Sequence, residues 1–207
     1  MLIIRHAESL YNVHLTADMD SDLTNHGEFQ AEIISNYIKP FDLLGYSGFT
    51  SPMLRCLKTA RYIHRKTDIK FKVCPELCEV SWCFPETGLP IRVMAEPFWE
   101  MDWTGVKDEE TLNLPKETDS MFLEKMAQFF ATIPEKSIIV THGTCVMTLV
   151  ELARNTKLEK VPDWDGSIRN ASLTEIVKGV PTCSSVKNAS LTEIANGVPQ
   201  HIGKVVY

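Results

Sequence analysis

An arginine and a histidine stand together where an apolar segment ends, close to the start of the chain. Leu2-Ile3-Ile4 is followed directly by Arg5-His6. Arginine presents a planar fork of N–H donors that matches phosphate oxygens, and a neutral imidazole is a nucleophile near pH 7. The pair therefore suits binding of a phosphate group and attack on it, although a dipeptide of this kind also recurs by chance.

Three later segments supply the other groups that such chemistry needs. Ser51-Pro52-Met53-Leu54-Arg55 places a second arginine in the first turn of an expected helix. Leu77-Cys78-Glu79 brings a carboxylate, and Val140-Thr141-His142-Gly143 ends a second apolar segment in a histidine. Phosphate ester hydrolysis requires a nucleophile, cations on the phosphate oxygens and a proton for the leaving group, and this set contains candidates for each.

Apolar segments of strand and helix type alternate along the chain. This alternation predicts a doubly wound, mainly parallel α/β sheet flanked by helices. Such sheets bind ligands beyond the carboxyl ends of their strands, where both Arg5-His6 and Thr141-His142 fall. The helix after Gly143 directs its free N–H groups to the same place. We expect strands at 1–6, 43–50, 69–74 and 136–141, and helices at 25–38, 53–64, 118–132 and 143–155.

One expected helix also carries a clear apolar face. In residues 118–132, which begin at Thr118, apolar side chains recur at helical spacing. We expect this face to be buried, and it consists of Met121, Phe122, Met126, Phe129 and Phe130.

Composition places the chain among soluble globular proteins. It has 207 residues, 44% of them hydrophobic and 23% charged, which suits one domain over residues 1–207. No apolar run reaches the roughly 20 residues that span a bilayer, and the chain begins without a signal-peptide pattern, so we expect a cytoplasmic protein without a membrane partner. The net charge of -6 argues against nucleic-acid binding.

The six cysteines are expected to be free thiols, since nothing indicates secretion. Cys74, Cys78 and Cys83 cluster, but their spacing does not match a zinc knuckle. We therefore expect neither a metal nor a cofactor, because arginine and histidine can neutralise the phosphate. The oligomeric state cannot be inferred from the sequence.

Two segments depart from the regular pattern. Residues 79–117 contain three of the four tryptophans and several prolines, which predicts a lid-like insertion over the site; the alternative is a small second core under a long loop. Residues 167–199 contain a tandem repeat, since Ser167–Ile176 recurs as Ser185–Ile194. The repeat predicts either an extra edge strand or a longer loop with one copy in the sheet.

Arg-His, Ser-Pro-x-x-Arg and Thr-His-Gly, with Asp22-Leu23-Thr24 and Gly27 between them, follow one another in a specific order. In this order and spacing the chain resembles the histidine phosphatase superfamily, also called phosphoglycerate mutase-like, from residue 2 to about residue 155. The resemblance implies a phosphohistidine on His6. Arg5, Arg55, His142 and Gly143 are expected to bind the phosphate, and Asn12 falls where the family has a phosphate- or substrate-contacting asparagine.

Glu79 is the expected general acid, because it fits the Leu-x-Glu pattern of the family. It must keep a proton near neutral pH, which a dry pocket lined by Trp82 and Phe84 could achieve by raising its pKa. Glu76 and Glu86 remain alternative proton donors, since geometry rather than spacing decides this role.

Departures from the family pattern bear on the reaction. Ala7 replaces a glycine common in the mutases, and no clear Gly-x-Trp-Glu-Gly signature follows Glu79. These features favour a metal-independent phosphatase acting on a small phosphorylated substrate of unknown identity. Two alternatives stay open: a phosphoglycerate mutase-type phosphoryl transfer, revealed by isomerisation that needs a bisphosphate primer, and a non-catalytic phosphate-binding module, revealed by binding without turnover.

Overall fold

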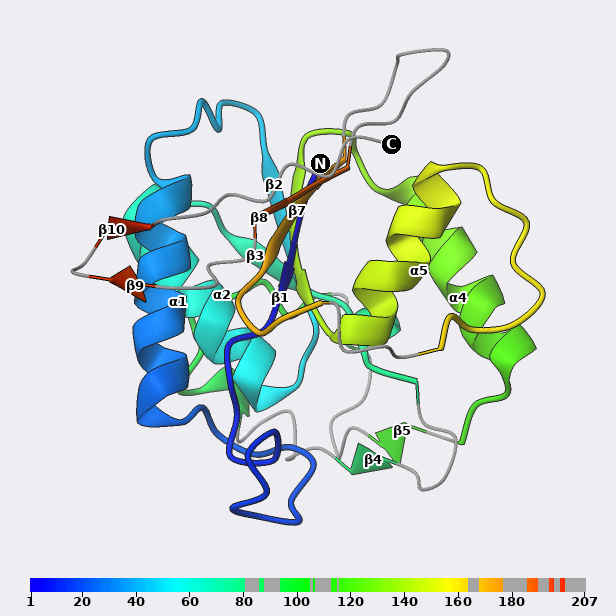
Figure 1. Cartoon of the computed structure of the whole chain (residues 1–207), viewed down its shortest axis with the longest axis horizontal. Coiled ribbons are helices and arrows are strands. Elements are labelled where there is room, and N and C mark those ends of the chain that lie inside the picture. The colour runs from blue at the N-terminus through cyan, green and yellow to red at the C-terminus, as the bar shows by residue number, and fades with distance from the viewer. Residues whose placement is uncertain are drawn as a thin grey trace.

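A twisted six-stranded sheet with the strand order β3-β2-β6-β1-β7-β8 forms the centre of the protein (Figure 1). In the computed structural model, the described residues are 1–80, 86–87, 94–104, 106, 113–114, 116–163, 168–176, 186–189, 194–195 and 198–199. The strands of the sheet are β1 (Leu2–Arg5), β2 (Ser47–Thr50), β3 (Phe71–Val73), β6 (Ser137–Thr141), β7 (Leu173–Ile176) and β8 (Val186–Ala189).

The first four of these strands run parallel to one another, whereas β7 and β8 pair antiparallel at the other side of β1. Two small pairs lie outside this sheet, and both are antiparallel. They are β4 (Glu86–Thr87) with β5 (Asn113–Leu114), and β9 (Ile194–Ala195) with β10 (Val198–Pro199).

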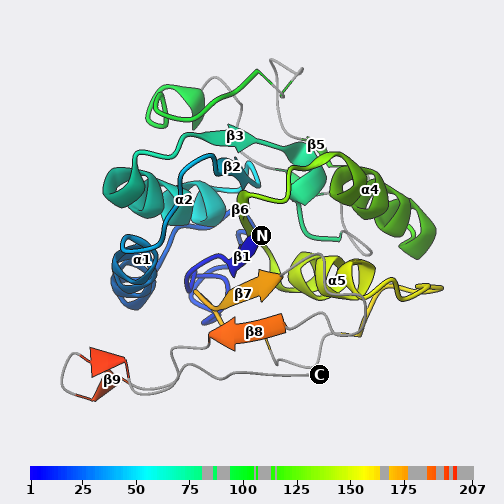
Figure 2. The same ribbon diagram turned by 90° about the horizontal axis from the view of Figure 1, so that it is seen from above.

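Helices cover both faces of the sheet, as a doubly wound arrangement requires. Seen from above, α1 and α2 lie on one face and α4 and α5 on the other (Figure 2). Their bounds are α1 Asn25–Ile38, α2 Leu54–Thr67, α4 Asp119–Thr132 and α5 Gly143–Ala153, and a short 3₁₀ helix spans Pro75–Leu77. No helix among the described residues is long and apolar enough to cross a membrane.

Strand β1 separates two hydrophobic cores by simple alternation of its side chains. Leu2 and Ile4 join the core under α1 and α2. Met1 and Ile3 point the other way, into the core under α4 and α5. Both faces of β1 are therefore buried, which explains its continuous apolar sequence. Arg5 is the last residue of β1 and stands at the carboxyl end of the strand.

Threonine caps start the two helices that begin outside the site. The Thr24 hydroxyl accepts from the Gly27 N–H at 2.8 Å, and the Thr118 hydroxyl accepts from the Met121 N–H at 3.3 Å. Each bond satisfies an N–H that the first helical turn leaves without a partner. These caps set the starts of α1 and α4 at the positions that the sequence predicts.

Two details of the expected elements are wrong. Only Ser47–Thr50 of the expected strand 43–50 is extended, because the Tyr46 N–H turns back to the Leu43 carbonyl. Met121 is 49% exposed rather than part of the buried face of α4. Phe122, Met126 and Phe129 form the buried stripe at helical spacing, and Met121 projects about 100° away from it.

The longest described segment of the expected lid, residues 94–104, packs beside β3 and α2. Met94, Phe98 and Met101 are buried in the core under α1 and α2, and the Trp103 indole N–H donates to the Phe98 carbonyl at 3.0 Å. Trp99 is 81% exposed. Trp82 and Phe84, expected to line a dry pocket, lie outside the described residues.

The two copies of the C-terminal repeat contribute different strands. Residues 173–176 of the first copy form β7, whereas residues 186–189 of the second copy form β8 at the sheet edge. Asn170-Ala171 forms a turn next to the end of β1, but the matching Asn188-Ala189 lies within β8. Identical local sequence thus adopts two conformations.

Candidate active site

The two histidines are brought together by the pairing of β1 with β6. Arg5 stands opposite Thr141 in this parallel pair, and the His6 N–H donates to the Thr141 carbonyl at 2.8 Å. His6 and His142 therefore follow at the same edge of the sheet. Their ring centroids are 5.2 Å apart in an edge-to-face arrangement, and both residues are buried.

Arg55 lies between the two imidazoles. Its Nε–H donates to Nε2 of His6 at 3.3 Å, and its Nη2 contacts Nδ1 of His142 at 3.2 Å. A third guanidinium N–H donates to the Met19 carbonyl. Because a guanidinium only donates, both contacted imidazole nitrogens act as acceptors. One cation thus contacts both histidines.

These contacts determine the tautomer of each imidazole. His6 Nδ1 lies 2.8 Å from the Ala7 carbonyl, which can only accept, so Nδ1 carries the hydrogen and Nε2 the lone pair. His142 accepts at Nδ1, and its Nε2–H donates to the Ser51 hydroxyl at 2.9 Å. The lone pair of His6 Nε2 is therefore directed at the Arg55 guanidinium.

Burial and nearby cations keep both histidines neutral. Loss of water contact lowers the pKa of His6 well below its usual value, and the charges of Arg55 and Arg5 lower it further. The pKa of His142 falls for the same reasons. An imidazole must be neutral to attack phosphorus, so the pocket favours the reactive form of His6.

Arg5 lies at the edge of this cluster and is partly buried. Its Nη1 donates to the Ile168 carbonyl at 2.6 Å. Burial lowers its pKa to about 10, with Glu79 opposing and Arg55 adding to the change. Arg5 thus stays charged at neutral pH, and two guanidinium groups face the same region of an otherwise acidic protein.

Glu79 lies close to the N-terminus of α5. Its two carboxylate oxygens accept from the backbone N–H groups of Thr144, at 3.2 Å, and Val80, at 3.1 Å. Burial raises the pKa of the carboxyl group, although these bonds and the Arg55 charge oppose the shift. The α5 N–H groups beside Gly143, which the sequence suggests for the phosphate, are therefore shared with a carboxylate.

The other two candidate acids differ from Glu79 in position. Glu76 is exposed and lines a pocket of about 510 Å³ between β3 and α4. Glu86 belongs to β4, and its side chain lies outside the described residues. The charge of Glu79, in contrast, interacts with those of Arg5 and Arg55.

Asn12 lies in the loop after His6. Its Oδ1 accepts from the Ser9 N–H and the Ser9 hydroxyl, both at 3.1 Å, and from Asn170 Nδ2 at 3.0 Å. With the oxygen occupied in this way, Nδ2 is the donor that Asn12 can offer to another group. Asn12 as a whole is partly buried.

Helix α2 and the loop between β1 and α1 hold one another in place. The Ala7 N–H donates to the Thr59 hydroxyl at 3.1 Å, and the Leu54 N–H donates to the Asp20 carboxylate at 2.7 Å. Thr59 in turn donates to the Arg55 carbonyl at 2.7 Å. These bonds position Arg55 relative to His6 although the two residues belong to different elements.

Sequence reasoning missed two residues at this site. Ser51, the first residue of the Ser-Pro-x-x-Arg motif, contacts the His142 ring, and Asn170 contacts Asn12 and the His6 carbonyl. Their types gave no signal by themselves. The recurrence of Asn-Ala-Ser in the repeat was visible, but which copy approaches the site was not.

The described cysteines near the site are buried free thiols. They are Cys56, Cys74, Cys78 and Cys145. Cys56 Sγ lies 3.5 Å from His142 Nε2. Burial raises the pKa of Cys56 beyond the range of a reactive thiolate, which makes a packing role the simplest account of it. Within the described ranges, no group of three His, Cys, Asp or Glu side chains could hold a metal ion.

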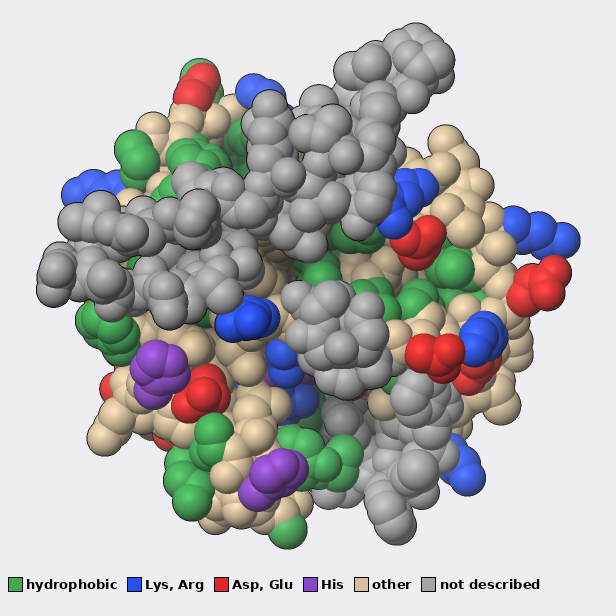
Figure 3. Space-filling view, viewed as in Figure 1, with side chains coloured by type: hydrophobic (Ala, Val, Ile, Leu, Met, Phe, Trp, Pro, Cys, Tyr) green, Lys and Arg blue, Asp and Glu red, His purple; other side chains and the backbone are tan. Residues whose placement is uncertain are grey.

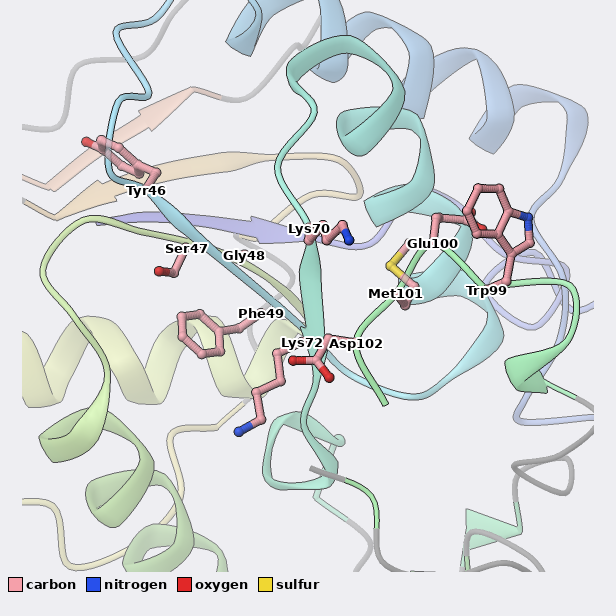
Figure 4. Close-up of a pocket in the computed structure, with 10 residues that line it drawn as sticks. All are labelled: Tyr46, Ser47, Gly48, Phe49, Lys70, Lys72, Trp99, Glu100, Met101 and Asp102. Atoms are coloured by element: carbon pink, nitrogen blue, oxygen red, sulfur yellow. The ribbon is translucent and has the colours of Figure 1, made fainter. Parts of the chain in front are cut away.

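Positively charged side chains are also visible at the surface of the protein. Near the centre of Figure 3, below the place where β1 ends in Figure 1, Lys and Arg side chains gather around a hollow. A different pocket, of about 660 Å³, lies beside β2 and β3 (Figure 4). Lys70 and Lys72 contribute to this second pocket, but Asp102 and Glu100 offset their charges, and none of the five expected catalytic residues lines it.

The fold and the site together define an α/β protein with two histidines and two arginines at the carboxyl ends of adjacent parallel strands. A model of the histidine phosphatase superfamily (branch 1) matches residues 1–187, and the chain belongs to this family. No curated protein matches the sequence.

Solved structures share the fold at low sequence identity. A mycobacterial glucosyl-3-phosphoglycerate phosphatase with VO3 is 17% identical (TM-score 0.54; 86% of this chain and 92% of that chain covered). A phosphoserine phosphatase from Entamoeba histolytica is 20% identical (TM-score 0.56; 85% and 89%). An ecdysone phosphate phosphatase from Bombix mori with tungstate is 18% identical (TM-score 0.63; 99% and 95%).

Proposed function

We propose that the protein is a phosphatase that hydrolyses a small phosphate monoester through a phosphohistidine on His6. The observation that carries the proposal is the Arg55 contact with Nε2 of a neutral, buried His6. A cation beside a nucleophilic nitrogen can bind phosphate oxygens and bring phosphorus to that nitrogen. The three similar structures named above are phosphatases, which agrees with this reaction.

In the first step, His6 Nε2 forms a bond to phosphorus and the ester P–O bond breaks. Arg55 exchanges its contact with His6 for the phosphate oxygens, which frees the nitrogen lone pair. Arg5, His142 and Asn12 complete the phosphate site. Glu79, whose pKa is raised by burial, gives a proton to the leaving alkoxide. The products are an alcohol and the phosphorylated imidazole.

In the second step, water attacks phosphorus and the P–N bond breaks. The Glu79 carboxylate takes a proton from this water, and phosphate and neutral His6 are restored. The Nδ1–H of His6 stays bonded to the Ala7 carbonyl throughout, so the imidazole needs no rearrangement between the steps. Protein cations neutralise the phosphate in both steps, and we expect no metal requirement.

Turnover of p-nitrophenyl phosphate in the presence of a chelator tests this proposal. We expect hydrolysis in EDTA. We also expect that quenching with base rather than acid traps one phosphoryl group per chain, because the label on His6 is stable in base and labile in acid. His26 is exposed and provides a matched control, so His26→Ala should retain activity while His6→Ala loses it. Binding of phosphate without hydrolysis over a broad substrate panel would instead favour the non-catalytic alternative.

A further inference from the structure

The Asn170 side chain joins two parts of the active site that are distant in sequence. Its Nδ2 donates one hydrogen to the His6 carbonyl at 3.1 Å and the other to Asn12 Oδ1 at 3.0 Å. These acceptors precede Asn170 by 164 and 158 residues. One amide group from the C-terminal segment therefore contacts both the nucleophile's backbone and a candidate phosphate ligand.

Three hydrogen bonds to Asn12 Oδ1, one of them from Asn170, determine which end of the Asn12 amide is available. Oδ1 of Asn12 receives hydrogen bonds from Asn170 and from the N–H and hydroxyl of Ser9. Reversing the Asn12 amide would place an NH₂ group against two N–H donors. The arrangement thus holds Nδ2 of Asn12 as the outward donor, which is the polarity that phosphate oxygens require.

The backbone around Asn170 keeps this side chain in place. Ala171 has a positive φ of 53°, which L-residues rarely adopt, and its N–H donates to the same His6 carbonyl at 3.1 Å. The Arg5 N–H then donates to the Ser172 carbonyl at 3.1 Å. The turn is attached directly to the end of β1, so a rigid element supports the Asn170 amide.

We propose that Asn170 is a positioning residue that acts through Asn12, because it fixes the Asn12 amide with its donor end toward the bound phosphate. The proposal rests on the phosphate site described above. It also assigns different roles to the two repeat copies, since Asn188 is followed by the same residues in sequence but lies in β8, paired with Thr174.

Affinity for inorganic phosphate tests this role. Asn170→Ala should weaken phosphate binding by roughly 5-fold, as expected for one misoriented hydrogen bond, and Asn12→Ala by a similar factor. The double variant should bind no more weakly than Asn12→Ala alone, because Asn170 acts through Asn12. Asn188→Ala is the matched control and should bind like the unmodified protein. Losses that add in the double variant, or a loss confined to Asn188→Ala, would overturn the proposal.

The isosteric variant Asn170→Asp guards against a simple folding failure. It keeps the size of the side chain but removes both donors, and Asn188→Asp makes the same change of charge in the second copy. Circular dichroism melting should show both variants folded, and only Asn170→Asp should weaken phosphate binding. Equal affinity in these two variants would count against the role of Asn170.

A measurement on the free protein separates this proposal from the proposed function. The side-chain ¹⁵N–¹H signals of Asn12, identified by their loss in Asn12→Ala, report its amide environment without phosphate or turnover. They should shift and exchange faster in Asn170→Asp but not in Asn188→Asp. Unchanged Asn12 signals in Asn170→Asp would disprove the positioning role. A protein that neither binds nor hydrolyses phosphate would disprove the function while these signals still report on Asn170.

Discussion

The Nε–H of Arg55 donates to Nε2 of His6 across 3.3 Å, although the two residues come from different elements. The same guanidinium contacts His142, so its shape matters as well as its charge. The Ser-Pro-x-x-Arg motif therefore supplies an arginine that contacts the histidines after β1 and β6.

Arg55→Lys should lose most activity even though the positive charge remains. A lysine ammonium cannot reproduce the planar fork that reaches His6, His142 and the phosphate oxygens together. We expect kcat/KM for p-nitrophenyl phosphate to fall by about 100-fold, the size reported for loss of one preorganised donor. Arg65→Lys, at an exposed position near the end of α2, is the control. Near-normal kinetics for Arg55→Lys would place Arg55 outside the phosphate site.

His6→Ala should abolish turnover and leave the fold intact, because His6 follows the end of β1 rather than lying within it. Incubation of the unmodified protein with ³²P-labelled substrate should give an acid-labile, base-stable label on His6. The label should be absent from His6→Ala. A label found on His142 would exchange the roles of the two histidines.

Glu79→Gln should slow the hydrolysis of alkyl phosphates far more than that of p-nitrophenyl phosphate. An alkoxide needs a proton in order to leave, whereas p-nitrophenolate does not. We expect a loss of about 100-fold or more for alkyl phosphates. Equal losses for both substrates would mean that Glu79 has a structural role, and would redirect attention to Glu76 and Glu86.

The pH profile follows from the directions of the two pKa shifts. Activity requires neutral His6, whose pKa is lowered, and protonated Glu79, whose pKa is raised. Activity should therefore persist below pH 6.5, and should decline as rising pH deprotonates Glu79. In Glu79→Gln the basic limb of kcat should disappear while the acidic limb from His6 remains. A basic limb that persists in this variant would assign the acid role to another group.

Ser51→Ala should lower kcat because the His142 ring loses the hydroxyl that accepts from its Nε2–H at 2.9 Å. Ser51→Thr keeps a hydroxyl and should retain more activity than Ser51→Ala. The ¹⁵N chemical shift of His142 Nε2 should change in Ser51→Ala, because its N–H loses the hydroxyl acceptor, whereas Nδ1 still accepts from Arg55. An unchanged His142 spectrum in Ser51→Ala would show that the hydroxyl does not control the ring.

Gly27→Ala should destabilise the protein and reduce activity. A Cβ at Gly27 would stand 2.0 Å from the Glu8 carbonyl oxygen, in the loop that follows His6. Relief of this overlap requires backbone movement, which we expect to cost about 1–3 kcal/mol of unfolding free energy. Urea denaturation measures the loss, and Gly45→Ala is not a suitable control because Gly45 has a positive φ. An exposed position in the same helix, Asn36→Ala, serves instead and should change little.

Much of the fold could be predicted from local sequence because its signals are local. The apolar run before Arg5 is buried on both faces of β1, and the Thr24 and Thr118 hydroxyls begin helices where the sequence predicts them. Parallel α/β sheets place strand ends at one edge, so the meeting of His6 and His142 also followed from the order of elements. Glu79, in contrast, is expected from the Leu-x-Glu pattern of the family rather than from the order of elements.

Tertiary structure alone decided the contacts that set the chemistry. The tautomer of His6 depends on the Ala7 carbonyl and that of His142 on the Arg55 guanidinium, and spacing in sequence does not specify such contacts. The raised pKa of Glu79 results from burial outweighing the opposing hydrogen bonds and charge.

The repeat shows the limit of local sequence most directly. Asn170-Ala171 and Asn188-Ala189 are identical pairs within identical heptapeptides, yet the first forms the turn at His6 and the second lies in β8. The amino-acid sequence determines that either copy can pair in a sheet. Which copy meets β1 depends on long-range hydrogen bonds to Arg5, His6 and Asn12, and these exist only once the chain has folded.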